Sequence, residues 1–359
     1  MKLTINTIKF QELLTKSIKG ASNNKLIPLT SLMAIELKDE VLSLTTTDAT
    51  NYLVVKESGI KGDYFYVVVE VETFSKLISR MTSDLITLEL TDNYLNVTGN
   101  GTYKIELTLD EDGNLIKYPE PISAMDKNNV IGKIKQTTIK RILSSIKPAL
   151  LTTMEMPCYT CYYVGDCVIG TDTYKISSLK EHIFDTPRLL SADLFNLLDV
   201  ITDDEITVYA DGNKLLFTSP KCSVYGLETP GIENFCIDAI NELIVKPFNS
   251  RCKLPRNAIT QLLDRISLFV GAYDKGEITL TFTKEGLIVS SKMSTGTELI
   301  KYVESNNFVD FICKIDVIML MSQIKAQASD IIEVYYGDDS AIKIVDGSVT
   351  SVVALLADD

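Results

Sequence analysis

Hydrophobic and polar positions along this chain follow two periods, and the same order of periods occurs three times. Residues 73–82 carry apolar side chains at helical spacing, residues 84–88 and 95–98 alternate as strands do, and a turn is expected at 91–93. The order helix, strand, turn, strand returns at 191–202, 205–209, 210–213 and 215–218, and again at 314–327, 331–335, 337–340 and 342–345. A repeat of such length predicts three structurally similar domains.

Each copy contains a second amphipathic helix nearer its beginning. These helices are predicted at 7–20, 135–150 and 256–270, where Pro255 favours the start of the third. Alternating runs such as 33–37, 42–45 and 278–282 lie between the two helices of a copy and are expected to be strands. The fold class is therefore α+β, with two helices packed on antiparallel sheets in each of three domains.

Equivalent residues in the three copies give the length of the repeat, and breaks in the pattern give the domain boundaries. Ile86, Ile206 and Ile332 hold the same place in each copy and are 120 and then 126 residues apart. Proline-containing breaks near 119–123 and 246–250 place the domains at 1–122, 123–247 and 248–359.

Composition excludes several classes of protein. The chain has 359 residues, of which 45% are hydrophobic, so it can bury a large core. It has no apolar run long enough to cross a membrane and its start does not have the order of a signal peptide, so we expect a cytoplasmic protein. Seven scattered cysteines predict free thiols rather than a disulfide framework. Cys158-x-x-Cys161 with Cys167 could suggest zinc, but a fourth ligand at suitable spacing is missing.

Catalytic motifs are equally scarce. The chain has one histidine, His182, and neither a phosphate-binding loop nor a His-Glu-x-x-His metal motif. The acidic pairs at 203–204 and 338–339 fall in predicted turns, where aspartate bends the chain. We therefore expect no catalytic residues, no metal and no cofactor.

Three short segments carry a resemblance to a known family. Ile27-Pro28-Leu29 precedes a strand, the segment 42–48 reads Leu-Ser-Leu-Thr-Thr-Thr-Asp, and the segment 168–172 reads Val-Ile-Gly-Thr-Asp. Together with the order of the repeats over the whole chain, these segments resemble the bacterial DNA polymerase III beta subunit, the sliding clamp. The resemblance implies the clamp fold and a head-to-tail homodimeric ring whose helices line a hole for duplex DNA. It also implies partners, namely a DNA polymerase and an ATP-driven clamp loader, that bind through short linear peptides.

The charge pattern agrees with such a ring. The formal net charge is −13, which by itself argues against a nucleic-acid partner. The six predicted helices nevertheless carry a combined charge of +8, which leaves −21 for the rest of the chain. For DNA contact that is independent of base sequence, we single out basic residues on or beside these helices. They are Lys16, Lys25, Lys76, Arg80, Lys140, Arg141, Lys147, Arg256, Arg265 and Lys325.

The resemblance also implies two protein-binding sites. The partner-peptide pocket would be formed by Met156, Thr171, Thr173, Tyr174, Lys175, Ile176, Val352, Ala354, Leu355 and Leu356. The subunit interface would be formed by Tyr103, Lys104 and Ile105 of one chain and by Leu268 and Phe269 of the other. The chain departs from the family at 173–175 and ends in Asp358-Asp359 rather than in a basic residue, so a less acidic peptide would be favoured.

Two other functions remain as alternatives. An interaction scaffold built from repeats would use the acidic surface for protein partners without encircling DNA, although the basic helices argue against it. A nuclease or phosphatase using the acidic turns would need divalent ions and would show turnover.

Overall fold

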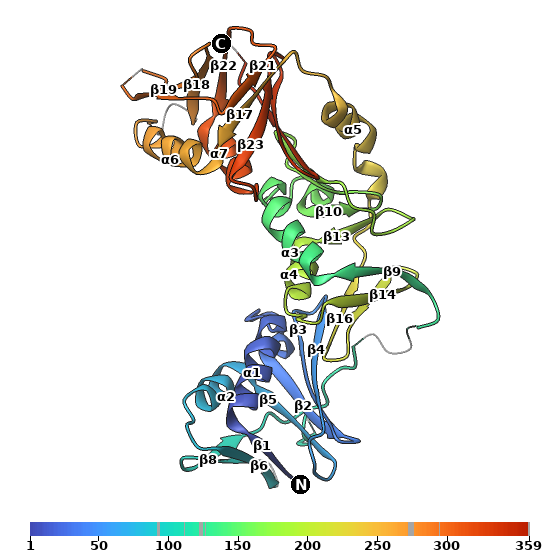
Figure 1. The fold of residues 1–359 in the computed structure, drawn as a ribbon. Helices are drawn as coiled ribbons and strands as arrows, with labels where there is room; N and C mark the ends of the chain where they lie inside the picture. Colours follow the sequence, from blue (N-terminus) through green and yellow to red (C-terminus); the bar gives the residue numbers. More distant parts are fainter. Residues whose placement is uncertain are drawn as a thin grey trace. The chain divides into compact units, whose positions relative to one another are not determined.

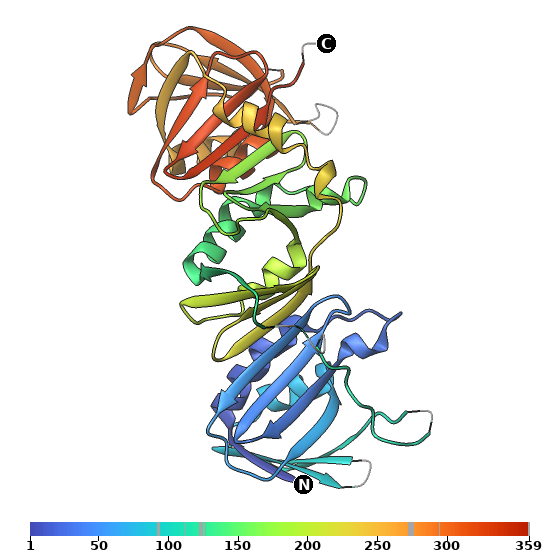
Figure 2. The ribbon, with the colours of Figure 1, turned by 90° about the vertical axis from the view of Figure 1, so that its right-hand side faces the viewer.

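The structure is a computed structural model that describes residues 1–91, 94–110, 112–121, 125, 127–271, 276–293 and 295–357. The chain folds into two compact units, Met1–Ile139 with Asp193–Glu228 and Lys140–Ala192 with Thr229–Asp359. In each unit, helices pack on antiparallel sheets (Figures 1 and 2). The second predicted domain contributes to both units, and the predicted boundary at 122/123 lies outside the described residues. The division into three domains therefore stays a prediction.

Two antiparallel sheets form the first unit. The four-stranded sheet has the order β1 (Lys2–Asn6), β6 (Leu85–Thr91), β7 (Tyr94–Thr98) and β8 (Thr102–Glu106). The eight-stranded sheet has the order β5 (Phe65–Glu70), β2 (Leu32–Lys38), β3 (Val41–Thr47), β4 (Tyr52–Ser58), β16 (Cys222–Leu227), β15 (Lys214–Thr218), β14 (Glu205–Asp211) and β9 (Val130–Lys135).

The second unit also has two antiparallel sheets. The nine-stranded sheet has the order β13 (Arg188–Ser191), β10 (Cys161–Val164), β11 (Val168–Thr171), β12 (Lys175–Leu179), β25 (Val349–Ala354), β24 (Ala341–Asp346), β23 (Ile331–Tyr336), β17 (Ser250–Pro255) and β21 (Glu304–Asn306). The four-stranded sheet has the order β20 (Thr297–Ile300), β19 (Leu287–Ser291), β18 (Glu277–Phe282) and β22 (Phe311–Asp316).

Seven α-helices occur in the described part of the chain. They are α1 (Thr7–Ser17), α2 (Val71–Ser79), α3 (Gln136–Ser145), α4 (Ala192–Leu198), α5 (Ile237–Val245), α6 (Arg256–Ser267) and α7 (Val317–Lys325). Side-chain oxygens of Asn6, Glu70 and Asp316 accept hydrogen bonds from the first turns of α1, α2 and α7, which explains where these helices begin. α6 follows Pro255, as the sequence predicts.

The strand register confirms the threefold repeat. In each copy, the strand before the first helix pairs with the strand after the second helix, as β1 with β6, β9 with β14 and β17 with β23. The repeat markers Ile86, Ile206 and Ile332 stand opposite Ile5, Ile134 and Leu254. One backbone hydrogen bond also recurs at each helix start, from Thr7 N to Asp84 O (3.1 Å), from Gln136 N to Asp204 O (3.0 Å) and from Arg256 N to Asp330 O (2.8 Å).

The structure corrects some predicted elements. Residues 314–316 belong to β22, and α7 starts only at Val317 because the Asp316 carboxylate accepts from Ile318 N at 2.7 Å. The segment predicted as a helix at 191–202 ends its α-helix at Leu198. Of the predicted turn at 91–93, residues 92 and 93 lie outside the described residues. The sequence did not predict α5, whose apolar side chains lie just before the boundary placed at 247.

The core is formed by the apolar faces of these helices and sheets. In the second unit, one buried cluster joins α6 and α7 to β18, β23 and β24, and includes Leu263, Leu320 and Ile332. Among the described residues, no helix is long and apolar enough to span a membrane.

Candidate functional site

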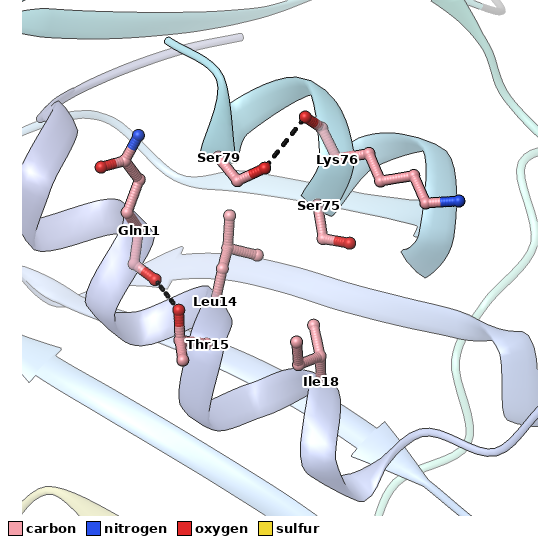
Figure 3. Close-up of a pocket in the computed structure, with 7 residues that line it drawn as sticks. All are labelled: Gln11, Leu14, Thr15, Ile18, Ser75, Lys76 and Ser79. Carbon is pink, nitrogen blue, oxygen red and sulfur yellow. Dashed lines mark hydrogen bonds between the residues drawn. The ribbon is translucent and has the colours of Figure 1, made fainter. Parts of the chain in front are cut away.

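Four of the ten residues predicted to contact DNA belong to the first unit. α1 and α2 enclose a groove of about 330 Å³ that Gln11, Leu14, Thr15, Ile18, Ser75, Lys76 and Ser79 line (Figure 3). The Gln11 amide donates to the carbonyl oxygens of Ile78 (2.8 Å) and Met81 (3.0 Å), which holds the two helices together.

The four basic side chains of the first unit differ in their ion pairs and hydrogen bonds. Lys25 and Arg80 are exposed and have no ionic partner among the residues that the structure describes. Lys76 is paired with Glu72 one helical turn away. The Lys16 ammonium donates to the Thr202 hydroxyl at 3.1 Å.

The other six predicted DNA contacts belong to the second unit. Lys140 on α3 and Lys147 beside it are exposed, whereas Arg141 is half-buried near the Asp346 carboxylate. Arg256 donates through Nε to the Ser329 carbonyl at 2.9 Å. Arg265 makes a bidentate ion pair with Glu298, at 2.8 and 2.6 Å, and Lys325 pairs with Asp264 at 3.0 Å.

These contacts reduce the positive charge that the helices offer to a ligand. Three of the ten residues already form an ion pair with a carboxylate, and Arg141 lies near a fourth carboxylate. Within the helix bounds of the structure, the six predicted helices carry a combined charge of +4 rather than +8, because Lys19, Arg80, Lys135 and Lys147 lie just outside those bounds. The basic character of the helices persists but is weaker than the sequence suggested.

The residues predicted to bind a partner peptide all belong to the second unit, where strand pairing brings several of them together. β12 pairs with β25, so Ile176 stands opposite Val352 and Lys175 opposite Val353. The turn before β12 is fixed locally. The Thr171 hydroxyl donates to the Lys175 carbonyl at 2.8 Å, and Thr173 adopts a left-handed φ of 78°.

The end of β25 and the tail that follows it lie beside this turn. Ala354 N donates to the Tyr174 carbonyl at 2.8 Å, Leu355 N donates to the Ser340 carbonyl at 2.9 Å and Leu356 N donates to the Lys314 carbonyl at 2.9 Å. A cavity of about 340 Å³ lies at the tail, lined by Thr279, Phe311, Ile312, Cys313, Lys314, Asp339, Leu355 and Leu356. Met156 and Tyr174 are exposed at the surface, while Ile176 and Val352 are buried.

α5 explains why these two residues are buried. Ile237, Ile240 and Ile244 of α5 pack on the apolar cluster that contains Ile176 and Val352. The Lys343 ammonium donates to the carbonyl oxygens of Ile244 (3.4 Å) and Lys246 (2.7 Å), and burial lowers its pKa. The helix is therefore held at its C-terminal end as a cover over the predicted pocket, a role that nothing in the predicted repeat indicated.

Four of the five residues predicted at the subunit interface are exposed in the single chain, and Ile105 is half-buried. β8 is a free edge of its sheet and carries Tyr103, Lys104 and Ile105. A cavity of about 460 Å³ beside it is lined by Thr73, Lys76, Leu77, Arg80, Met81, Asn100 and Tyr103. Just beyond α6, Leu268 and Phe269 are 82% and 52% exposed. Large apolar side chains so exposed favour burial against a protein surface.

The cysteines form no metal site in the described residues. All seven are free thiols, and no group of three or more His, Cys, Asp or Glu side chains could hold a metal ion there. Burial raises the pKa of Cys222, Cys252 and Cys313 to about 12, so these thiols stay protonated.

The repeat, the helix pairs and the sheet order together define the fold of a DNA sliding clamp. The DNA polymerase III beta chain of Streptococcus pneumoniae matches 99% of this chain over 100% of its own length, with a TM-score of 0.87 at 16% identity. The sliding clamp of Bacillus subtilis matches over the full length of both chains, with a TM-score of 0.86 at 16% identity. The DNA polymerase III beta subunit of Thermotoga maritima also matches over both full lengths, with a TM-score of 0.81 at 15% identity.

These likenesses confirm the predicted fold along the whole chain. No protein-family model matches the sequence, and no curated protein matches it either. The fold is thus shared with bacterial clamps while the sequence has diverged from theirs.

Proposed function

We propose that this protein is a DNA sliding clamp subunit. Two copies would close head to tail into a ring around duplex DNA and tether a DNA polymerase and other replication or repair proteins in the cytoplasm. The observation that carries the proposal is the clamp fold over the whole chain, with its threefold repeat. The protein would be a non-catalytic processivity factor that needs no cofactor, and a separate ATP-driven loader would open the ring.

The DNA-facing surface would consist of the ten basic residues named above. Lys25, Arg80 and Lys140 would contribute most, because each is exposed and none has an ionic partner in the described part of the chain. Lys76, Arg265 and Lys325 would contribute less, since a phosphate must first displace the carboxylate that each already binds. Contacts of this kind carry no base information, which suits a ring that moves along DNA.

The subunit interface would join β8 of one copy to the region around α6 of the other. β20 is a free edge of the sheet on which α6 packs, so β8 and β20 could pair across the interface and leave neither edge exposed. Leu268 and Phe269 would then enter the cavity beside Tyr103 in the other copy. A symmetric dimer contains this contact twice, which closes the ring.

The peptide site would lie between the turn at 171–175, Met156 and the tail at 354–356. Exposed Met156 and Tyr174 would form its rim, and the cavity beside Leu355 and Leu356 would accept an apolar anchor. The terminal Asp358 and Asp359 lie outside the described residues, so their effect on peptide choice stays a hypothesis. Equal affinity for acidic and basic variants of one peptide would remove it.

Retention on circular DNA tests the ring directly. After loading by the cognate loader, the protein should stay on nicked circular plasmid and should leave the same plasmid once it is linearised, because a ring slides off free ends. Dimer mass is measured separately. Equal retention on both forms, or none with a loader shown to work on its own substrate, would favour the interaction scaffold.

A further inference from the structure

Two cysteines far apart in the sequence share one hydrogen-bond acceptor beside the start of α5. The thiols of Cys158 and Cys236 each lie 3.9 Å from the same acceptor, the carbonyl oxygen of Asn234. Cys158 belongs to the short 3-10 helix Pro157–Thr160, and Cys236 is the residue from which α5 starts. The pairing differs from the Cys158-x-x-Cys161 motif of the sequence, since Cys161 is buried and contacts the Thr229 hydroxyl at 3.4 Å.

Aromatic packing joins the chain neighbours of the two cysteines. The Phe235 ring makes an edge contact with Tyr159, with centroids 5.4 Å apart, and stacks on Tyr163 at 5.2 Å. Phe235 directly precedes Cys236 in the chain, and Tyr159 directly follows Cys158. Cys236 is exposed and Cys158 half-buried, so an oxidant in solution reaches Cys236 first.

We propose that Cys158 and Cys236 can form a reversible disulfide that holds α5 in place over the peptide site proposed above. The Cys236 thiolate attacks a hydroperoxide such as hydrogen peroxide, takes one oxygen and releases hydroxide, which gives a sulfenic acid. The Cys158 thiol then attacks that sulfur, the S–S bond forms and water leaves. Two thiols are oxidised, one peroxide is reduced to two waters, and a dithiol reverses the reaction.

The disulfide would affect peptide binding because α5 covers part of the proposed peptide site. This part of the proposal rests on the function proposed above. Ile176 and Val352 are 6% and 4% exposed because α5 packs on their cluster. A peptide whose first anchor occupies the cavity beside Leu355 and Leu356 therefore reaches Ile176 and Val352 with a second anchor only when α5 moves aside. Lys343 already holds the C-terminal end of the helix. A disulfide at Cys236 would hold the N-terminal end as well and would keep the helix in place.

Disulfide mapping on the full-length protein tests the pairing. Reduced protein is treated with hydrogen peroxide, alkylated with iodoacetamide and digested without reductant. We expect one cross-linked peptide pair that contains Cys158 and Cys236, lost in Cys158→Ser and in Cys236→Ser and retained in the matched control Cys161→Ser. A Cys158–Cys161 bond, a bond between two chains, or no bond would overturn the proposal.

Two further measurements test the locking. Amide hydrogen exchange along α5 should slow about tenfold or more on oxidation, with no change in Cys236→Ser. A fluorescein-labelled pentapeptide with leucine and phenylalanine anchors should bind about tenfold more weakly to oxidised protein and recover with dithiothreitol. Unchanged exchange and affinity in protein with the mapped bond would overturn the lock. If the reduced protein fails to bind the peptide, the proposed groove fails, while the mapping still decides the disulfide on its own.

Discussion

Leu268 offers a sharp test of the proposed ring because its side chain is 82% exposed in the single chain. If dimer formation buries that side chain, Leu268→Ala removes about 2 kcal/mol of apolar burial per contact. The ring contains the contact twice, so its association weakens by about 4 kcal/mol, which is a rise of about 10³-fold in the dissociation constant. Sedimentation velocity over a dilution series should show dimer in the native protein and monomer in the variant at the same concentrations.

A matched substitution separates this effect from a general loss of stability. Leu26 is 91% exposed in the first unit and belongs neither to β8 nor to the lining of the cavity beside it, so Leu26→Ala should leave the dimer unchanged. Neither substitution should change the free energy of unfolding of the monomer by more than about 0.5 kcal/mol, since both side chains are exposed there. A dimer of native affinity in Leu268→Ala, or equal weakening in both variants, would refute the proposed interface.

Three further predictions concern charge, acid and packing. Lys140→Gln should reduce the slope of log binding constant against log salt concentration, for short duplex DNA, by about one unit. Lys76→Gln should change that slope less, because Lys76 is already paired with Glu72, and equal changes in the two variants would contradict this ranking. Burial opposes ionisation of Asp338, but hydrogen bonds from Lys246 and Ser340 outweigh it and lower its pKa to about 2. The stability that this carboxylate contributes is therefore present above its unfolded pKa of about 3.9 and is lost as the pH falls towards 2. Urea unfolding should show a loss of about 1 kcal/mol in the free energy of unfolding over this range, and Asp338→Asn should not show that loss. Gly170→Ala should destabilise the second unit by about 1–3 kcal/mol in the same assay, because its Cβ would lie 2.9 Å from Ile146 Cγ2 and 3.0 Å from Ile146 O, and native stability would show that the site relaxes.

The sequence predicted the repeated elements well because periodicity reports local burial. The helices predicted at 7–20, 135–150 and 256–270 occur as the shorter α-helices 7–17, 136–145 and 256–267. The strands after the second helix of each copy occur where the pattern placed them. Equivalent positions such as Ile86 and Ile332 also have equivalent strand partners. The alternation of apolar and polar residues, together with the long repeat, was sufficient to predict the fold class.

Other features depend on contacts that a linear pattern does not contain. The ion pair of Arg265 with Glu298 joins residues 33 positions apart, so the free charge of the helices could not be counted from sequence alone. α5 was missed because it lies between the last predicted strand of the second copy and the boundary at 247, outside the repeated pattern. Cys158 and Cys236 share the Asn234 carbonyl only because α5 starts at Cys236, whereas the sequence pattern placed Cys158 with Cys161 as a possible zinc motif and gave no reason to consider Cys236.

If the protein moves along DNA as proposed, the carboxylates beside the basic helices affect that motion. Glu72, Glu298 and Asp264 each hold a basic side chain that a phosphate would otherwise take. In a clamp, every such phosphate contact is an exchange of one anion for another, with a small net free energy in either direction. The energy of the ring then varies little from one base pair to the next, so these three acidic residues would raise its one-dimensional diffusion coefficient while the closed ring, rather than affinity, keeps it on the duplex.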